Sequence, residues 1–278
     1  MITLEKVSKI YNGSQVPVYA LRDVSLKVAE GEFVAVMGPS GSGKSTLLGV
    51  LGAMNSPSEG RVVIDGIDVY GLRAERQADF RHEYIGFVFQ HLQLLPYLTA
   101  QENVQLALVI AQLTKAEKRA RAREALARVG LGGKEGRLPY QLSGGEQGRV
   151  AVARAIINQP PVLLADEPTG NLDRQTGTQV LELLRELNQA GQTVIMVTHD
   201  PLAAQYAGRR VQILDGQITP STFQGENSAS PAPWASLRLG SPEATATTRS
   251  RSSAATSSSA TPSKARPASR SMSPGMRR

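Results

Sequence analysis

The chain has 278 residues, of which 41% are hydrophobic and 20% are charged, and it contains no cysteine. This length and composition are those of a globular protein with a sizeable core, and the lack of cysteine excludes disulfides and thiolate metal sites. The formal net charge of +7 is concentrated in residues 222–278, which hold eight Lys and Arg and two Glu, so residues 1–221 are close to neutral.

The N-terminal third predicts short strands around one glycine-rich loop. Apolar and polar residues alternate over 2–7 and 21–28, which favours half-buried strands, and the apolar run 33–37 favours a strand buried on both faces. Residues 45–51, after the glycine-rich loop, predict a helix. The first residues lack a basic region followed by an apolar stretch, so we expect no secretory signal there. No run approaches the ~18 apolar residues that span a bilayer.

The rest of the folded part alternates strands with helices. Apolar residues at helical spacing predict a helix over 115–129, within a helical insert of about 92–150, and an amphipathic helix over 178–190. Further strands are predicted at 61–66, 85–89, 162–165, 193–197 and 211–216. The pattern predicts an α/β fold with a mostly parallel core sheet, an N-terminal antiparallel part and a helical insert.

Residues 222–278 differ in composition from the rest. They are rich in Ser, Ala, Thr, Pro and Arg and almost without branched apolar side chains. Such a segment buries too little surface to offset the entropy of ordering, so we predict one folded domain over 1–221 followed by a disordered basic tail. The tail is interpreted as a solvated extension; the alternative is an arm that binds nucleic acid or anionic lipid.

The glycine-rich loop at residues 38–46 follows the phosphate-loop pattern of Gly, four residues, Gly, Lys and Ser or Thr, between a buried strand and a helix. Glycines let consecutive backbone N–H groups point at phosphate oxygens, and the helix start adds its positive dipole end. The Lys44 ammonium is expected to reach the β- and γ-phosphates and the Ser45 hydroxyl to bind Mg²⁺. The predicted phosphate-binding residues are Gly38, Ser40, Gly41, Gly43, Lys44, Ser45 and Thr46.

Two carboxylates end the apolar strand at 162–165. Asp166 fits the acid that organises Mg²⁺ in P-loop nucleoside triphosphatases. Glu167 fits the general base that polarises the attacking water. Because strands often end in acidic turns, Asp166 and Glu167 indicate a nucleotide site only in combination with the phosphate loop.

The stretch 142–147, Leu-Ser-Gly-Gly-Glu-Gln, resembles the signature sequence of the ABC ATPase family. A helix is predicted over 149–157, just after this stretch, and Ser143, Gly144 and Gly145 are expected to form a second anion-binding loop at its N-terminus. In the family this surface completes the nucleotide site of a partner subunit, so the resemblance, which covers about residues 1–218, implies a dimer that binds and hydrolyses ATP with Mg²⁺.

Four other residues match the family in order and spacing. Gln90 resembles the Q-loop glutamine that senses Mg²⁺ and water, and Asp173 resembles the D-loop residue that crosses the dimer interface. His199 resembles the switch histidine that contacts the γ-phosphate, and Tyr11, in a polar turn, resembles the residue that stacks on adenine. The resemblance thus implies catalytic roles for Lys44, Glu167 and His199 and metal contacts for Ser45, Gln90 and Asp166.

The stretches 89–96, 99–104 and 166–173 look like the bacterial subfamily of lipoprotein-releasing, macrolide-export and cell-division ABC ATPases. The resemblance implies a second ATPase subunit, an integral-membrane permease, no nucleic acid, and a peripheral place on the cytoplasmic face of the inner or plasma membrane with indirect membrane contact. The alternative is a soluble ABC ATPase that serves no permease. One departure is Gly148, where the family usually has Gln; a glycine within a helix is expected to loosen the signature loop.

Overall fold

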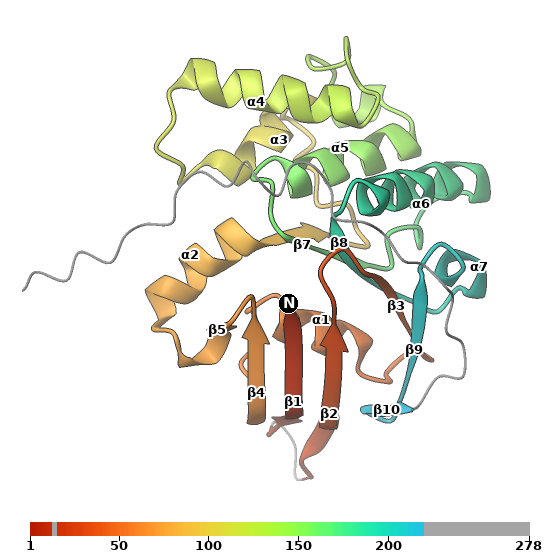
Figure 1. Ribbon diagram of the computed structural model, residues 1–278. Helices are drawn as coiled ribbons and strands as arrows, with labels where there is room; N and C mark the ends of the chain where they lie inside the picture. Colours follow the sequence, from red (N-terminus) through yellow and green to blue (C-terminus); the bar gives the residue numbers. More distant parts are fainter. Residues whose placement is uncertain (13–15, 220–278) are drawn as a thin grey trace, which may run out of the picture. The chain divides into compact units, whose positions relative to one another are not determined.

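The computed structural model describes residues 1–12 and 16–219, so the predicted tail at 222–278 lies outside the described residues. Two sheets organise this part of the chain (Figure 1). The antiparallel N-terminal sheet has the order β2-β1-β4-β5 and the other sheet the order β10-β9-β3-β8-β7-β6. The first comprises β1 (Ile2–Tyr11), β2 (Val18–Val28), β4 (Glu59–Ile64) and β5 (Ile67–Asp68). The second comprises β3 (Phe33–Met37), β6 (Ile85–Val88), β7 (Val162–Asp166), β8 (Thr193–Thr198), β9 (Arg209–Leu214) and β10 (Gln217–Thr219).

The second sheet is parallel except for β10, which pairs antiparallel with β9. All six residues of β8 are buried, as the continuous apolar run predicted. The helices are α1 (Lys44–Leu51), α2 (Ala74–Tyr84), α3 (Ala100–Gln105), α4 (Lys115–Arg128), α5 (Gly144–Ile156), α6 (Arg174–Gln189) and α7 (Pro201–Ala204), with 3-10 turns η1 (Val69–Gly71), η2 (Leu106–Leu108) and η3 (Pro139–Gln141). The predicted α/β class, antiparallel part and helical insert are confirmed.

Two apolar cores lie on opposite faces of the parallel sheet. Val34 and Val36 of β3 join the core shared with α1 and the N-terminal sheet. Ala35, between them, joins the core shared with α3, α4, α5 and α6. Because successive strand residues point to opposite faces, one short strand anchors both layers. Figure 1 shows the helical insert on one side of this sheet and the N-terminal sheet on the other.

Two helices begin earlier than predicted, each at the residue that follows its side-chain cap. α5 begins at Gly144, since Ser143 and Glu146 form a capping box, rather than at residue 149. α6 begins at Arg174, since the Asp173 carboxylate accepts a hydrogen bond from the Thr176 N–H. Within the described residues, no helix is both long enough and apolar enough to cross a membrane.

Gly148 occupies a close approach between α5 and α6. A Cβ added there would lie 3.0 Å from Val180 Cγ2 and 3.5 Å from Leu172 Cδ1. Beside the expected loosening of the signature loop, the missing side chain at Gly148 lets α6 and the segment before it pack closely against α5.

Candidate functional site

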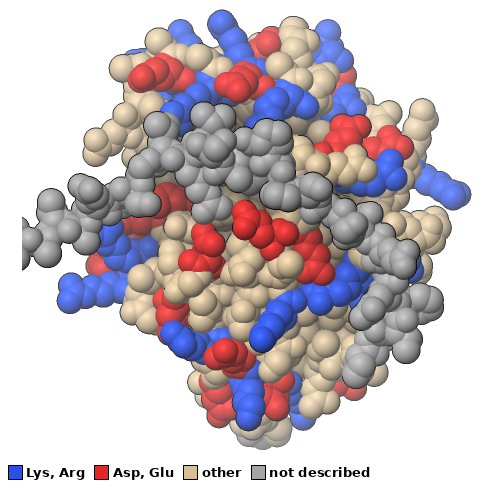
Figure 2. Space-filling model, in the orientation of Figure 1, with Lys and Arg blue, Asp and Glu red and all other residues tan. Residues whose placement is uncertain are grey.

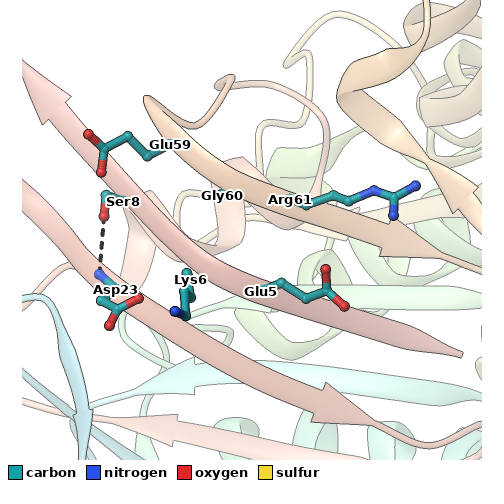
Figure 3. Close-up of a pocket in the computed structure, with 7 residues that line it drawn as sticks. All are labelled: Glu5, Lys6, Ser8, Asp23, Glu59, Gly60 and Arg61. Carbon is teal, nitrogen blue, oxygen red and sulfur yellow. Dashed lines mark hydrogen bonds between the residues drawn. The ribbon is translucent and has the colours of Figure 1, made fainter.

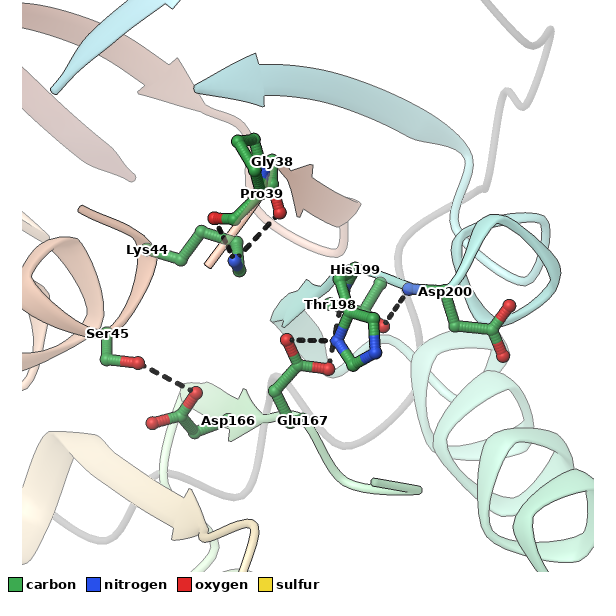
Figure 4. A network of polar contacts seen from close by, with 9 residues as sticks. All are labelled: Gly38, Pro39, Lys44, Ser45, Asp166, Glu167, Thr198, His199 and Asp200. Carbon is green, nitrogen blue, oxygen red and sulfur yellow. Dashed lines mark hydrogen bonds and ion pairs between the residues drawn. The ribbon is translucent and has the colours of Figure 1, made fainter. Parts of the chain in front are cut away.

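The phosphate loop joins the buried strand β3 to α1. Gly43 has φ 103°, and a Cβ there would lie 2.3 Å from the Ala20 carbonyl oxygen, so only glycine fits. No side chain caps α1, which leaves its first N–H groups available to an anion. Lys44 is 7% exposed, and its Nζ donates to the carbonyls of Gly38 and Pro39 at 2.8 and 2.9 Å (Figure 4). The ammonium is thus held at the loop where phosphates are expected.

The fold brings Asp166, at the end of β7, to the start of α1. The Ser45 hydroxyl donates to Asp166 Oδ1 at 3.3 Å although the two residues are 121 positions apart. Burial raises the pKa of Asp166 above its ordinary value, and the neighbouring Glu167 charge raises it further, against the Ser45 hydrogen bond and the Lys44 charge. Two oxygen donors suited to a hard cation therefore face each other beside the phosphate loop.

Glu167 is held by β8, the neighbouring strand. Its N–H donates to the Val197 carbonyl at 3.0 Å, its φ is 44°, and its Oε1 lies 2.9 Å from His199 Nδ1. The His199 N–H also points at the Glu167 carboxylate, at 3.4 Å. Figure 4 shows Glu167 and His199 in contact, while Lys44 binds the Gly38 and Pro39 carbonyls, so the hydrogen bonds of the described residues join two of the three residues predicted to be catalytic.

The signature loop is built as a helix cap. Ser143 Oγ accepts from the Glu146 N–H at 3.3 Å, and Glu146 Oε2 accepts from the Ser143 N–H at 2.9 Å. Lys134, from the loop after α4, pairs with the other Glu146 oxygen, and this hydrogen bond holds the pKa of Glu146 below its usual range. A Cβ at Gly145 would lie 2.2 Å from Thr176 Cγ2, so α6 approaches the loop directly.

The segments around Gln90 and Asp173 meet through Asn171. Asn171 Nδ2 donates to the Gln90 carbonyl at 3.0 Å and lies 3.0 Å from His91 Nδ1. Asp173 caps α6, and hydrogen bonds from the Thr176 hydroxyl and N–H lower the pKa of Asp173. Gln90 follows β6, which ends two residues earlier, at Val88.

Tyr11 is the last residue of β1 and pairs with Val18 of β2, so its placement in a turn was wrong. Tyr11 is 42% exposed, and Lys9 Nζ lies 5.2 Å from the centroid of its ring. An exposed face on a rigid strand is suitable for stacking on a base.

Some predicted site residues do not join this network. Among the described residues, Ser143 and Asp173 form their hydrogen bonds only within the signature loop and the start of α6. Sequence reasoning missed Lys134, which supports Glu146, and Arg154 of α5, which binds main-chain carbonyls 61 and 62 positions away. No local pattern marks either contact.

A depression of about 660 Å³ on the N-terminal sheet shares no residue with the phosphate loop (Figure 3). It lies where β1, β2 and β4 carry residues with positive φ, at Lys6, Asp23 and Gly60. Its lining mixes both charges and contains Glu5, Lys6, Ser8, Asp23, Glu59, Gly60 and Arg61. Acidic and basic side chains are likewise interspersed over the face drawn in Figure 2.

Comparisons with known proteins agree with this site. The family model described as ABC transporter matches residues 21–170. The chain is 47% identical over 218 residues to an uncharacterized ABC transporter ATP-binding protein, YvrO, of Bacillus subtilis, covering 78% of this chain and 95% of the relative. It is 46% identical over 233 residues to the macrolide export ATP-binding/permease protein MacB 1/2 of Paracoccus denitrificans, covering 84% of this chain but 35% of that protein.

Solved structures give the same result. The dimeric post-hydrolysis state of the ATP-binding cassette MJ0796 bound to ADP and Pi, from a protein of Methanocaldococcus jannaschii, superposes with a TM-score of 0.72 at 44% identity, covering 79% of this chain and 97% of that one. The cbiO1 protein of Clostridium perfringens, part of the ABC transporter complex cbiONQ, superposes at 0.70 and 30% identity, covering 79% of this chain and 86% of that one.

A lysine-bearing loop at an uncapped helix start, beside a strand-end carboxylate, is the arrangement of P-loop nucleoside triphosphatases. Within that class, the chain belongs to the ABC transporter family. It is the ATP-binding subunit of an ABC transporter, and it hydrolyses ATP.

Proposed function

We propose that this subunit powers a transporter of the lipoprotein-releasing or macrolide-export type by ATP-driven closure of a dimer. The observation that carries the proposal is that one chain has two helices that begin at glycine-rich loops, α1 and α5, and such helix starts favour anions. One ATP needs only one phosphate loop, so the second surface serves a nucleotide bound to another subunit. The dimeric MJ0796 relative, with ADP and Pi, supports this arrangement.

Each nucleotide contacts both subunits in this proposal. One subunit supplies the phosphate loop, with Lys44 as a fixed positive charge and Tyr11 stacked on adenine. The other supplies the Ser143 hydroxyl and the first N–H groups of α5, which lie at the positive end of the helix dipole. The predicted contacts from the second subunit are Ser143, Gly144, Gly145 and Asp173.

The residues present fit Mg²⁺. Ser45 Oγ and Asp166 Oδ1 lie 3.3 Å apart, and Mg²⁺ in nucleotide sites takes few protein oxygens because phosphates and waters complete its coordination. When bound, the ion neutralises charge that develops on the phosphates. Gln90 is proposed as a third contact, near the water.

Glu167 is proposed as the base that orients and deprotonates the attacking water. The contact of Glu167 Oε1 with His199 Nδ1 holds one carboxylate oxygen, and the hydrogen bond from the Glu167 N–H to the Val197 carbonyl fixes the backbone. Lys44 and the loop N–H groups stabilise charge on the γ-phosphate, while His199 and Gln90 report whether that phosphate is present. Loss of the phosphate removes the contacts between subunits, and the dimer reopens.

The proposed partners are a second copy of this chain and a membrane permease that docks near Gln90 and the helical insert. Membrane contact is then indirect, through the permease at the cytoplasmic face. MacB relatives, in which the matching part is about a third of an ATP-binding/permease protein, support coupling to a permease. The alternative is a soluble ABC ATPase without a permease. Co-purification distinguishes the two, because recovery of the chain with ribosomes or DNA instead of a membrane protein would favour the alternative.

The test of the site is Glu167→Gln in the purified chain. We expect ATP binding to persist, hydrolysis to stop and a dimer to accumulate with Mg²⁺ and ATP, measured by light scattering after size exclusion. Lys44→Ala is the matched control and should lose ATP affinity and remain monomeric. Turnover at the wild-type rate by Glu167→Gln would remove Glu167 from the mechanism.

A further inference from the structure

Arg154 of α5 is a half-buried cation, and within the described part of the chain its guanidinium bonds only main-chain carbonyls. Nη1 donates to the Gln93 carbonyl at 2.6 Å and Nη2 to the Leu92 carbonyl at 2.7 Å. None of the ion pairs formed within residues 1–12 and 16–219 includes Arg154. Burial lowers the pKa of the guanidinium, and an arginine remains charged after such a shift. The planar fork of arginine suits two adjacent acceptors, a geometry that lysine cannot match.

The two carbonyls belong to the segment that follows Gln90. Gln93 has φ 53°, a conformation that non-glycine residues adopt only when their surroundings hold them. Asn171 holds the same segment from the other side through the Gln90 carbonyl, at 3.0 Å. The segment from Gln90 to Gln93 is therefore fixed by side chains at both ends.

α5 carries Arg154 and also the signature loop. Arg154 lies eleven residues after Ser143, about 16 Å along a rigid helix at 1.5 Å per residue. α5 also packs on α6 and β6, so the helix behaves as one body. The signature loop and the guanidinium that binds the segment after Gln90 therefore belong to the same helix.

We propose that Arg154 is a positioning residue that ties the signature helix to the Gln90 segment, so that engagement of one nucleotide sets Gln90 at the other. Arg154 touches neither nucleotide; it acts through the backbone of residues 92 and 93. The inference rests on the proposed function, in which Gln90 approaches Mg²⁺ and the attacking water. It adds to that function a specific link between the two nucleotide surfaces of one subunit.

The test is a double-mutant cycle on kcat with the full chain: wild type, Arg154→Lys, Gln90→Ala and the double variant. Arg154→Lys keeps the charge but cannot bind both carbonyls. In the wild-type background, Arg154→Lys should lower kcat about tenfold and change KM for ATP less than about twofold. In the Gln90→Ala background, the same substitution should lower kcat less than about twofold further. Arg154→Gln gives a second cycle if the lysine variant does not fold.

Asn158→Ala is the structural control. Asn158 follows the same helix and donates to the carbonyls of His82 and Ala107, away from Gln90. The fold-loss in kcat from Asn158→Ala should be the same with and without Gln90→Ala, as expected for independent residues. Equal fold-losses from Arg154→Lys in both backgrounds, or an unchanged kcat, would overturn the inference. Failure of the proposed function is distinct, since Glu167→Gln would then leave turnover intact in an otherwise wild-type chain.

Discussion

Gly145→Ala tests how closely α6 approaches the signature loop. A Cβ at residue 145 would lie 2.2 Å from Thr176 Cγ2, well inside van der Waals contact. The Thr176 side chain cannot simply rotate away, because its hydroxyl donates to the Asp173 carboxylate that caps α6. The variant must therefore move α5 from α6 or break the cap.

The cost follows from these contacts. Overpacking of this severity costs up to about 3 kcal/mol, and the exchange of glycine for alanine in a helix returns up to about 1 kcal/mol. The expected net loss is about 2 kcal/mol of unfolding free energy. For a domain of this size that lowers Tm by roughly 4–8 °C, which thermal unfolding by circular dichroism measures directly.

Two variants make this reasoning refutable. Gly144→Ala is the matched control, because a Cβ there lies 3.4 Å from Leu172 Cδ2, an ordinary contact; its Tm should stay within about 2 °C of wild type. Thr176→Ser removes the Cγ2 methyl but keeps the hydroxyl, so it should restore most of the lost Tm when combined with Gly145→Ala. An unaltered Tm for Gly145→Ala, or no rescue by the serine, would contradict the packing described here.

Three further predictions concern buried or paired polar groups. Asn103 is fully buried and bonds the Leu95 N–H and carbonyl, so Asn103→Ala should lower the unfolding free energy by about 2–3 kcal/mol in urea; a loss below about 0.5 kcal/mol would contradict this. Because the pKa of Glu146 is lower in the folded state, its ionisation adds to the unfolding free energy at pH values above its unfolded pKa, about 4.3. This contribution is lost as pH falls through the pKa of the folded state. Lys134→Met should therefore shrink the difference in unfolding free energy between pH 7 and pH 3, and an unchanged difference would show that Lys134 does not set this pKa. Because the pKa of Asp166 is raised in the folded state, its ionisation lowers the unfolding free energy as pH rises. Asp166→Asn should therefore raise Tm at pH 8 but not at pH 3, while abolishing Mg²⁺-dependent hydrolysis. Equal Tm gains at both pH values would argue against a buried charge at Asp166.

Local motifs in the sequence predicted the two anion-binding loops because the residues of each loop are consecutive. Glycines, a lysine and a helix start need no distant partner to form a phosphate loop. The buried strands were predictable for the same reason, since a continuous apolar run has one stable environment. α2 was missed because only Phe80 of its eleven residues is buried and most of the others are polar, which leaves little periodic signal.

By itself, the sequence determined the phosphate loop, the acidic pair and the signature loop, because each consists of neighbouring residues. It also determined the fold class, because the order of strand and helix patterns along the chain specifies it. Only the tertiary structure decided that Ser45 meets Asp166, that Thr176 closes on Gly145, and that Arg154 holds the chain after Gln90. These contacts join residues far apart in the sequence; the packing of α1 on β7 sets the first, and the packing of α5 on α6 and β6 sets the other two. A periodic pattern specifies which face of an element is buried but not which distant side chain lies against it.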